Sequence, residues 1–121
     1  MRLQVLRERF TVCKLDHFKK ADLSVPFCFL SHTDEECSLV CPTAVVPAET
    51  LAREDGWKAF RVEGELDFGL VGILSAITSL LAEKKIPVFA VSTYNTDYVF
   101  LKEDKLPTAL WILSQNGYQI I

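Results

Sequence analysis

The order of apolar segments in the second half of the chain restricts the fold more than any other feature of the sequence. An extended segment at residues 59–63 is followed by apolar side chains spaced three and four residues apart, which is the repeat of one buried helix face. Two further apolar segments, residues 87–93 and 98–102, flank a polar stretch and predict a β-hairpin. The buried face of the helix is expected to carry Ile73, Leu74, Ile77, Leu80 and Leu81.

Capping and helix-breaking residues predict the ends of two helices. Pro87 should end the first helix, with Lys84 and Lys85 in its last turn, where positive charge suits the helix dipole. A second helix should start at Asp104 as its N-cap and stop at Gly117, with a last strand at residues 118–121. Its inward positions would be Leu106, Leu110 and Leu113. The predicted order is βαββαβ, a ferredoxin-like α+β fold with antiparallel sheets and helices on one face.

The first half of the chain repeats this order in abbreviated form. A displacement of 61 residues places segment 27–31 on segment 88–92 and Gly56 on Gly117, whereas the front of the repeat needs a displacement of 50. The first unit would therefore lack 11 residues at the position of its first helix. We therefore expect two fused units in tandem, residues 1–56 with a shortened first helix and residues 57–121 complete.

Strands that are apolar on both faces predict an association surface. Residues 27–30 and 88–91 are apolar at consecutive positions, so both faces of their sheet should be covered. Two helices and part of a third cannot cover both faces, and an uncovered apolar face favours association. A homodimer is the expected solution.

Composition argues against two classes of partner. The net charge is −3 and the 13 Lys and Arg residues are scattered, which is unfavourable for binding nucleic acid phosphates. The most apolar stretch, residues 66–81, is too short to span a bilayer, and the first ten residues lack the apolar core of a signal peptide. We expect a cytoplasmic protein that binds neither nucleic acid nor membrane.

The four cysteines predict buried thiols and neither a metal centre nor a catalytic nucleophile: Cys13, Cys28, Cys37 and Cys41. Four residues along a strand separate Cys28 from His32, and Cys37 from Cys41, by about 13 Å, too far to chelate one zinc ion from a single strand. Combinations across strands stay open. Neither His17 nor His32 lies in a nucleophile motif. We expect no metal, no cofactor and no enzymatic activity.

Four motifs resemble those of tandem ACT-domain proteins. They are FRVEGELDFGLVGIL at residues 60–74, STYNTDY at residues 92–98, TDEECSLVCP at residues 33–42 and GWK at residues 56–58. Cys37 stands where Leu is usual in that group. The resemblance covers roughly residues 9–121, and the same architecture is shared with the ACT modules of cytosolic arginine sensors. The resemblance implies a non-catalytic regulatory module that binds an amino acid at an interface between ACT units.

A ligand site is expected where the helix-entry loop, residues 66–72, meets the hairpin end, residues 93–97. Glycines in the loop allow close approach and leave amides of the helix N-terminus free for a carboxylate. Asp67 would receive an ammonium group or cap the helix. By the resemblance, Asp97 would pair with a guanidinium or ammonium group, or else cap the hairpin turn. The candidate residues are Asp67, Phe68, Gly69, Leu70, Val71, Gly72, Thr93, Tyr94, Asp97 and, from the first half, Ser38.

Two other classes of protein share parts of this pattern. An interaction module that has lost its ligand pocket would share every feature except an occupied site. An RNA-binding module of the RRM type has the same βαββαβ order, but it stacks bases on a strand with a basic signature before it. The corresponding segment, residues 98–101, has no such signature, and the chain is acidic.

Overall fold

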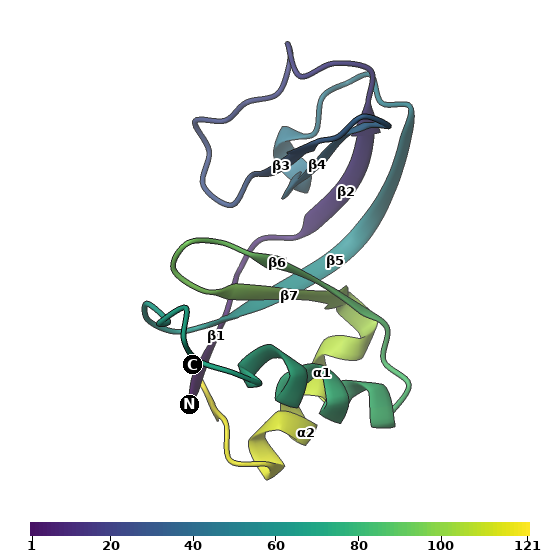
Figure 1. Ribbon diagram of the computed structural model, residues 1–121. Coiled ribbons are helices and arrows are strands. Elements are labelled where there is room, and N and C mark those ends of the chain that lie inside the picture. Colours follow the sequence, from purple (N-terminus) through teal and green to yellow (C-terminus); the bar gives the residue numbers. More distant parts are fainter. The chain divides into compact units, whose positions relative to one another are not determined.

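Eight β-strands and two α-helices make up the α+β fold of the computed structural model, which describes residues 1–121 (Figure 1). Contacts divide the chain into two units. We call Met1–Arg7 with Lys58–Ile121 the large unit, and Glu8–Trp57 the small unit. The strands are β1 (Arg2–Val5), β2 (Phe10–Leu15), β3 (Phe29–His32), β4 (Cys37–Pro42), β5 (Ala52–Val62), β6 (Val88–Ser92), β7 (Asp97–Lys102) and β8 (Gln119–Ile120). The helices are α1 (Ile73–Glu83) and α2 (Leu106–Gln115), with 3-10 turns η1 (Thr43–Val45) and η2 (Glu103–Lys105).

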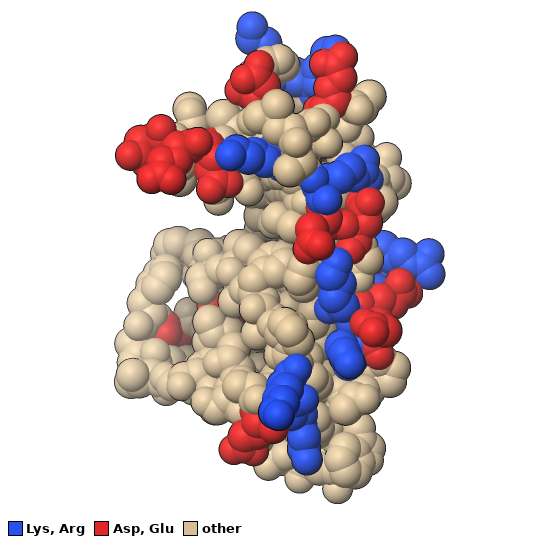
Figure 2. Space-filling model, turned by 90° about the vertical axis from the view of Figure 1, so that its right-hand side faces the viewer, with Lys and Arg blue, Asp and Glu red and all other residues tan.

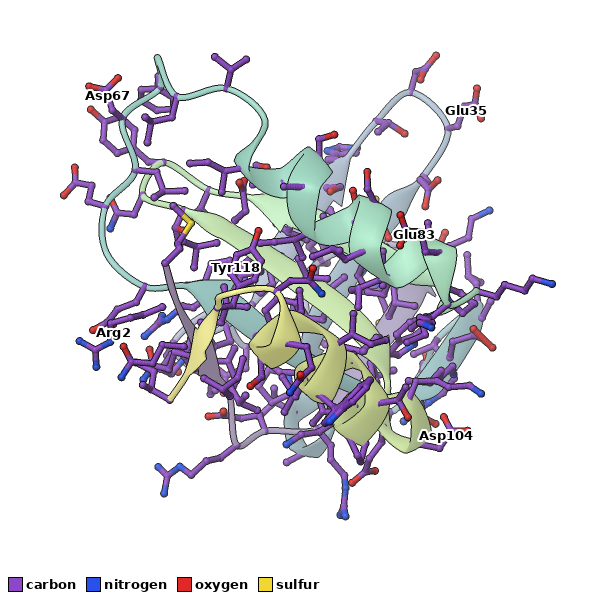
Figure 3. All side chains as sticks on the ribbon, turned by 90° about the horizontal axis from the view of Figure 1, so that it is seen from below. Arg2, Glu35, Asp67, Glu83, Asp104 and Tyr118 are labelled. Carbon is purple, nitrogen blue, oxygen red and sulfur yellow. The ribbon has the colours of Figure 1, made fainter.

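The large unit has the predicted βαββαβ order from β5 to β8. Its strands are arranged β6-β7-β5-β1-β8, and α1 and α2 lie side by side on one face of the sheet, as seen from below in Figure 3. The ferredoxin-like fold is thereby confirmed, but the sheet is mixed because β1 and β8 run parallel. Aliphatic and aromatic side chains fill the space between sheet and helices: Leu3, Phe60, Val62, Ile77, Leu81, Ile86, Val99, Leu101, Ala109, Ile112 and Leu113.

Strand β1 is the feature of the large unit that the sequence did not predict. It pairs antiparallel with β5 and parallel with β8, so it separates two strands that would otherwise be neighbours in a ferredoxin-like sheet. Leu3 is fully buried and pairs with Val62 on one side and Ile120 on the other. The expected division into residues 1–56 and 57–121 therefore differs from the observed units, in which residues 1–7 belong with residues 58–121.

Helix α1 has the predicted apolar face but ends before its lysines. Ile77 and Leu81 are buried, and Ile73, Leu74 and Leu80 pack partly against them, as the spacing indicated. Lys84 is the C-cap, and Lys85 adopts a left-handed conformation with φ of 58°. The Lys85 and Ile86 amides bond back to the carbonyls of Ala82 and Leu81, which closes the helix end. The two lysines therefore follow the last turn and do not lie in it.

Helix α2 starts later than predicted. Its N-cap is Lys105, with no side-chain hydrogen bond, so the prediction that Asp104 caps the helix was wrong; Asp104 lies in η2. Among the expected inward residues Leu113 is buried, but Leu110 is only half-buried. The other buried positions are Ala109 and Ile112. Gly117, with φ of 93°, follows the C-cap as predicted.

The small unit has the strand order β3-β4-β2-β5, to which β5 contributes residues 52–57. This is the order β6-β7-β5-β8 of the large unit without β1 and without either α-helix. We expected only the first helix to be shortened, but the second helix position also holds no more than η1. Pro47 explains this, because Val46 before it adopts extended backbone angles that cannot continue a helix.

The hairpins of the two units have the same construction. His32 pairs with Cys37 in one, and Ser92 pairs with Asp97 in the other. These pairs are related by a displacement of 60 residues, one fewer than the 61 that we predicted for this segment. In each turn a Thr amide donates to a carbonyl three residues on, at 2.9 Å. The displacement of 61 does relate Gly56 to Gly117, which both have positive φ.

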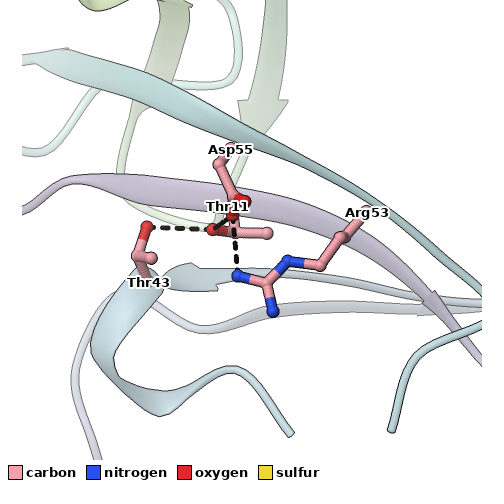
Figure 4. A network of polar contacts seen from close by, with 4 residues as sticks. All are labelled: Thr11, Thr43, Arg53 and Asp55. Carbon is pink, nitrogen blue, oxygen red and sulfur yellow. Dashed lines mark hydrogen bonds and ion pairs between the residues drawn. The ribbon is translucent and has the colours of Figure 1, made fainter. Parts of the chain in front are cut away.

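The core of the small unit is built from thiols and a polar network. Cys13, Leu15, Leu39 and Cys41 are buried, and Cys28, Cys37, Phe18, Ala21, Val45 and Val46 pack against them. Beside them lies Thr11, also fully buried (Figure 4). Its hydroxyl donates to Asp55 at 2.5 Å and lies 2.9 Å from the hydroxyl of Thr43, while Arg53 pairs with Asp55 at 2.8 Å. Loops and η1, not helices, thus cover this sheet.

Charged side chains are mixed on the face of the molecule that Figure 2 presents. Lys and Arg side chains alternate there with Asp and Glu side chains. Glu35 lies at the tip of the β3–β4 hairpin and points outward (Figure 3). No helix of the structure combines the length and the apolar character that crossing a bilayer requires.

Candidate functional site

The loop that leads into α1 and the β6–β7 turn are held together by hydrogen bonds. The amide of Leu66 donates to the carbonyl of Asn95 at 2.6 Å. The buried hydroxyl of Thr96 donates to the carbonyl of Val62, at the end of β5, at 2.8 Å. These bonds hold the loop against the hairpin turn, so the two segments meet as predicted.

A pocket of about 310 Å³ lies between the loop and the hairpin turn. Seven of the predicted residues line it: Asp67, Phe68, Leu70, Gly72, Thr93, Tyr94 and Asp97. Seven further residues line it. Leu66, Asn95 and Thr96 belong to the two predicted segments without being named as candidates, whereas Ile73, Leu74, Ser75 and Ser92 lie outside them. Every lining residue belongs to the large unit.

Three predicted residues do not line this pocket. Gly69 lies in the loop, and Val71 faces a neighbouring hollow of about 350 Å³ that Met1 and Tyr118 also line. Ser38 belongs to the small unit, where it lies on β4 beside Lys14 and lines a shallow depression of about 240 Å³. The structure thus gathers the loop and hairpin candidates but gives Ser38 different neighbours.

Asp67 organises the loop. Its carboxylate accepts a hydrogen bond from the Gly69 amide at 2.6 Å, and its carbonyl accepts one from Leu70 at 3.1 Å. A Cβ atom at Gly69 would lie 3.0 Å from that same carboxylate oxygen, so the tight turn favours glycine. The alternative that Asp67 caps the helix was wrong, since the N-cap of α1 is Gly72. In Figure 3, Asp67 lies on the loop, beyond the opposite end of α1 from Glu83.

The first turn of α1 presents backbone amides to the pocket. Gly72 adopts a left-handed conformation, with φ of 79°, and no side chain caps the helix. The first bond of the helix runs from the Ala76 amide to the Gly72 carbonyl, so the amides of residues 73–75 have no intrahelical partner. The positive end of the helix dipole lies at the same place. A sequence signal for this turn existed, because Gly72 precedes the apolar repeat where Ser, Thr, Asp or Asn would normally cap it.

The hairpin contributes a carboxylate and an aromatic ring. Ser92 donates its hydroxyl hydrogen to Asp97, its cross-strand partner, at 2.5 Å. Tyr94 meets Phe68 edge to face, with ring centres 5.1 Å apart. These two rings are 74% and 76% exposed, so they form a rim and not a core.

The charge of the pocket has one sign. Asp67 and Asp97 line it, whereas no Lys, Arg or His does. The structure has no group of three or more His, Cys, Asp or Glu side chains arranged to hold a metal ion. Titration is perturbed elsewhere, in the small unit, where burial raises the pKa of the Cys13 and Cys28 thiols and raises that of Cys41 to about 12.

The family model for the ACT domain matches residues 52–115, more than half of the chain, and this range includes the loop and the hairpin. The chain belongs to the ACT domain family. No curated protein matches it in a sequence search.

Solved structures extend the likeness to nearly the whole chain. A protein of Agobacterium tumefaciens is 25% identical, with a TM-score of 0.87, over 99% of this chain and 91% of its own. A Vibrio cholerae protein, described as of unknown function and a possible transport protein, is 19% identical with a TM-score of 0.74, over 92% and 85%. An aspartate kinase of Clostridium acetobutylicum, described as an allosteric enzyme, is 11% identical with a TM-score of 0.63, over 88% of this chain and 32% of its own. The last two share the fold alone.

Proposed function

We propose that this chain is a regulatory, non-catalytic ACT module that binds an amino acid in the pocket between the loop of residues 66–72 and the β6–β7 turn. ACT domains are in general small-molecule regulatory modules, and this chain is one of that family. The observation that carries the proposal is the meeting of unpartnered helix amides and two carboxylates in one pocket of about 310 Å³. An amino acid needs both kinds of group.

The ligand carboxylate would bind the first turn of α1. The amides of residues 73–75 point away from the helix at its positive end, which is a general binding site for anions. Gly72 leaves this end free of a capping side chain that would compete for the same amides. The pocket therefore supports recognition of the α-carboxylate by backbone and not by a cationic side chain.

The positive groups of the ligand would face Asp97 and Asp67. Asp97 is half-buried, so its interaction with a cation is screened less than that of the exposed Asp67. Two carboxylates without a cationic side chain favour an amino acid with a basic side chain, because it brings a net positive charge. The rings of Phe68 and Tyr94 offer an apolar surface for the aliphatic part of such a side chain.

We further propose that the small unit is a reduced ACT-like unit, in tandem with the large one. Its strand order and its hairpin pairing support this, since both repeat those of the large unit. The proposed boundary lies near residue 57, with β1 completing the second unit. Cytoplasmic location, as the sequence indicates, is part of the same proposal.

An interaction module is the second candidate, favoured by the exposed apolar rim. Val71 is 93% exposed, and Leu70 is 54% exposed beside Phe68. Such side chains near one another favour association, and a second copy of the chain is the simplest partner. In this reading the chain is a homodimer without a ligand.

Thermal-shift measurements with the twenty amino acids test the proposal. A basic amino acid should raise the Tm in a concentration-dependent way, because a ligand that binds only the folded state stabilises it. Asp97→Asn keeps the acceptor for Ser92 but removes the charge, and should weaken binding about 10- to 100-fold in calorimetry. Asp104→Asn, in η2 and outside the pocket, is the matched control and should bind as the wild type does.

Two outcomes would contradict this function. If no amino acid changes the Tm, and sedimentation shows a dimer that Val71→Asp dissociates, the interaction module is the better description. If an amino acid binds Asp97→Asn with unchanged affinity, the pocket has a ligand but Asp97 does not recognise it.

A further inference from the structure

Two cysteines of the small unit lie in one core cluster, Cys28 just before β3 and Cys41 in the neighbouring strand β4. Strands β3 and β4 pair antiparallel, with Phe29 opposite Val40 and Leu30 opposite Leu39. Continuing that register by one residue, to the position just before β3, places Cys28 opposite Cys41. Facing residues of an antiparallel pair project their side chains to the same side of the sheet.

The side chains of this pair share one environment. Cys41 is fully buried in the core of the small unit, and Cys28 packs against that core from the end of β3. Cys28 is the more accessible of the two, since it is only half-buried. Its thiol donates a weak hydrogen bond to the carbonyl of Asp22, 3.5 Å away, which is easily given up.

Register separates this pair from the other two thiols. Cys13 stands opposite Leu39 and is therefore only diagonal to Cys41, and Cys37 stands opposite His32. Facing residues have Cα atoms about 4.5–5.5 Å apart, within the range of about 4.4–6.8 Å that disulfides require. Diagonal residues lie about 7–8 Å apart, beyond that range.

We infer that Cys28 and Cys41 are a redox-active pair, which a low-molecular-weight disulfide such as oxidised glutathione converts into a reversible cross-strand disulfide. The Cys28 thiolate attacks the glutathione disulfide, and a Cys28–glutathione bond forms as one glutathione thiolate leaves. The Cys41 thiolate then attacks the Cys28 sulfur, which releases the second glutathione. The two thiol protons end on the two glutathione molecules, and the protein loses two electrons and two protons.

The environment of Cys41 sets the order and the rate of these steps. Burial raises the pKa of both thiols, that of Cys41 to about 12, so Cys41 is rarely ionised at neutral pH. Attack by the accessible Cys28 therefore comes first, and the mixed disulfide accumulates before the cross-link. Raising the pH should speed the second step. The product joins the first residue before β3 to β4, and so fastens an edge strand of the small unit.

Peptide mapping of the whole protein tests the inference. After incubation with oxidised glutathione and blocking of free thiols, cleavage after Lys, Arg and Glu gives three cysteine peptides. Residues 10–14 carry Cys13, residues 21–35 carry Cys28, and residues 37–49 carry Cys37 and Cys41. We expect a cross-link between the second and third peptides, which dithiothreitol removes. Fragment ions of the third peptide should assign the link to Cys41 and not to Cys37. This assignment uses the wild-type protein and does not depend on any variant.

Cysteine variants provide the controls. Cys41→Ser should abolish the link and stop at the glutathione adduct of Cys28, whereas Cys37→Ser and Cys13→Ser should retain it. The inference is overturned if the link maps to Cys37 or Cys13, or if prolonged incubation leaves only a glutathione adduct on the wild-type protein.

Discussion

The large unit covers one face of its sheet with α1 and α2, whereas the small unit arranges four strands in the corresponding order and covers them with loops and η1. The core of the large unit is made of apolar side chains without cysteine. The core of the small unit combines thiols and aliphatic groups, with the Thr11–Asp55 network beside it. The ferredoxin-like strand order can thus be kept when the helices are absent, provided that other groups fill the space they leave.

The comparison also shows where a ligand pocket can form. In the large unit the pocket depends on the first turn of α1, whose amides have no partner within the helix. The small unit has no helix at the corresponding position. Although its hairpin has the same pairing, it lacks the group that would receive a carboxylate. Retaining α1 is therefore what makes the large unit the better candidate for recognition.

The largest expected difference between the units is in the free energy of unfolding that is lost when a buried leucine is replaced by alanine. Leu81→Ala, between α1 and the sheet, should lower the free energy of unfolding by about 3–5 kcal/mol, because packed helices cannot collapse into the gap. Leu39→Ala, under loops, should cost about 2–3 kcal/mol, since loops can close around it. Urea unfolding followed by circular dichroism measures both. A larger cost for Leu39→Ala would mean that the small unit is packed as rigidly as the large one.

A smaller difference is expected for the two buried hydroxyl groups. Thr11→Val removes the two hydrogen bonds that the buried hydroxyl makes with Asp55 and Thr43, and should cost about 1–2 kcal/mol at about 1 kcal/mol each. Thr96→Val removes one bond, to the carbonyl of Val62, and should cost about 1 kcal/mol. The same unfolding experiment compares them. Equal costs would show that the second hydrogen bond of Thr11, with Thr43 in Figure 4, adds nothing to stability.

The last effect, which is absent at neutral pH, is an alkaline loss of stability that originates in the small unit. Burial raises the pKa of Cys41 from an ordinary value near 9.0 to about 12 in the folded protein. The unfolded chain therefore loses this proton first, so stability is complete below about pH 9 and falls as the pH rises toward 12. Cys41→Ala should flatten this part of the curve of unfolding midpoint against pH. Identical slopes above pH 9 would contradict the assignment to Cys41.

Much of the large unit could be predicted because its signals are periodic. The apolar repeat of α1 and the alternation of the hairpin each depend on many residues, so the pocket between them followed. Strand β1 could not be predicted, because Arg2 and the charges after it mask one decisive side chain, Leu3. A helix leaves an apolar repeat in the sequence, whereas a missing helix leaves no such signal. In the small unit only Pro47 indicates that the second helix is absent.

The role of Asp67 illustrates a different limit. A carboxylate shortly before an apolar repeat normally predicts an N-cap, but here a left-handed Gly72 caps the helix and Asp67 holds a separate turn. Gly72 before the apolar repeat is a signal for the helix start, but nothing in the sequence shows that Asp67 holds a turn of its own. The displacement between the two repeats was also not constant. It is 60 residues at the hairpins and 61 residues at Gly56 and Gly117, a difference of one residue that the sequence does not mark.

The pairing of β1 with β8 has a consequence for how the chain can be made. The Gln119 amide bonds to the Met1 carbonyl, and the Val5 amide bonds to that of Ile121. Because a ribosome produces residues 1–5 before residues 119–121, strand β1 has no partner on that side until residues 119–121 have been made. All residues of the small unit are synthesised before the last strand of the large unit, so the small unit can fold first. Residues that are in contact but more than 100 positions apart in the sequence also favour slow folding of the large unit.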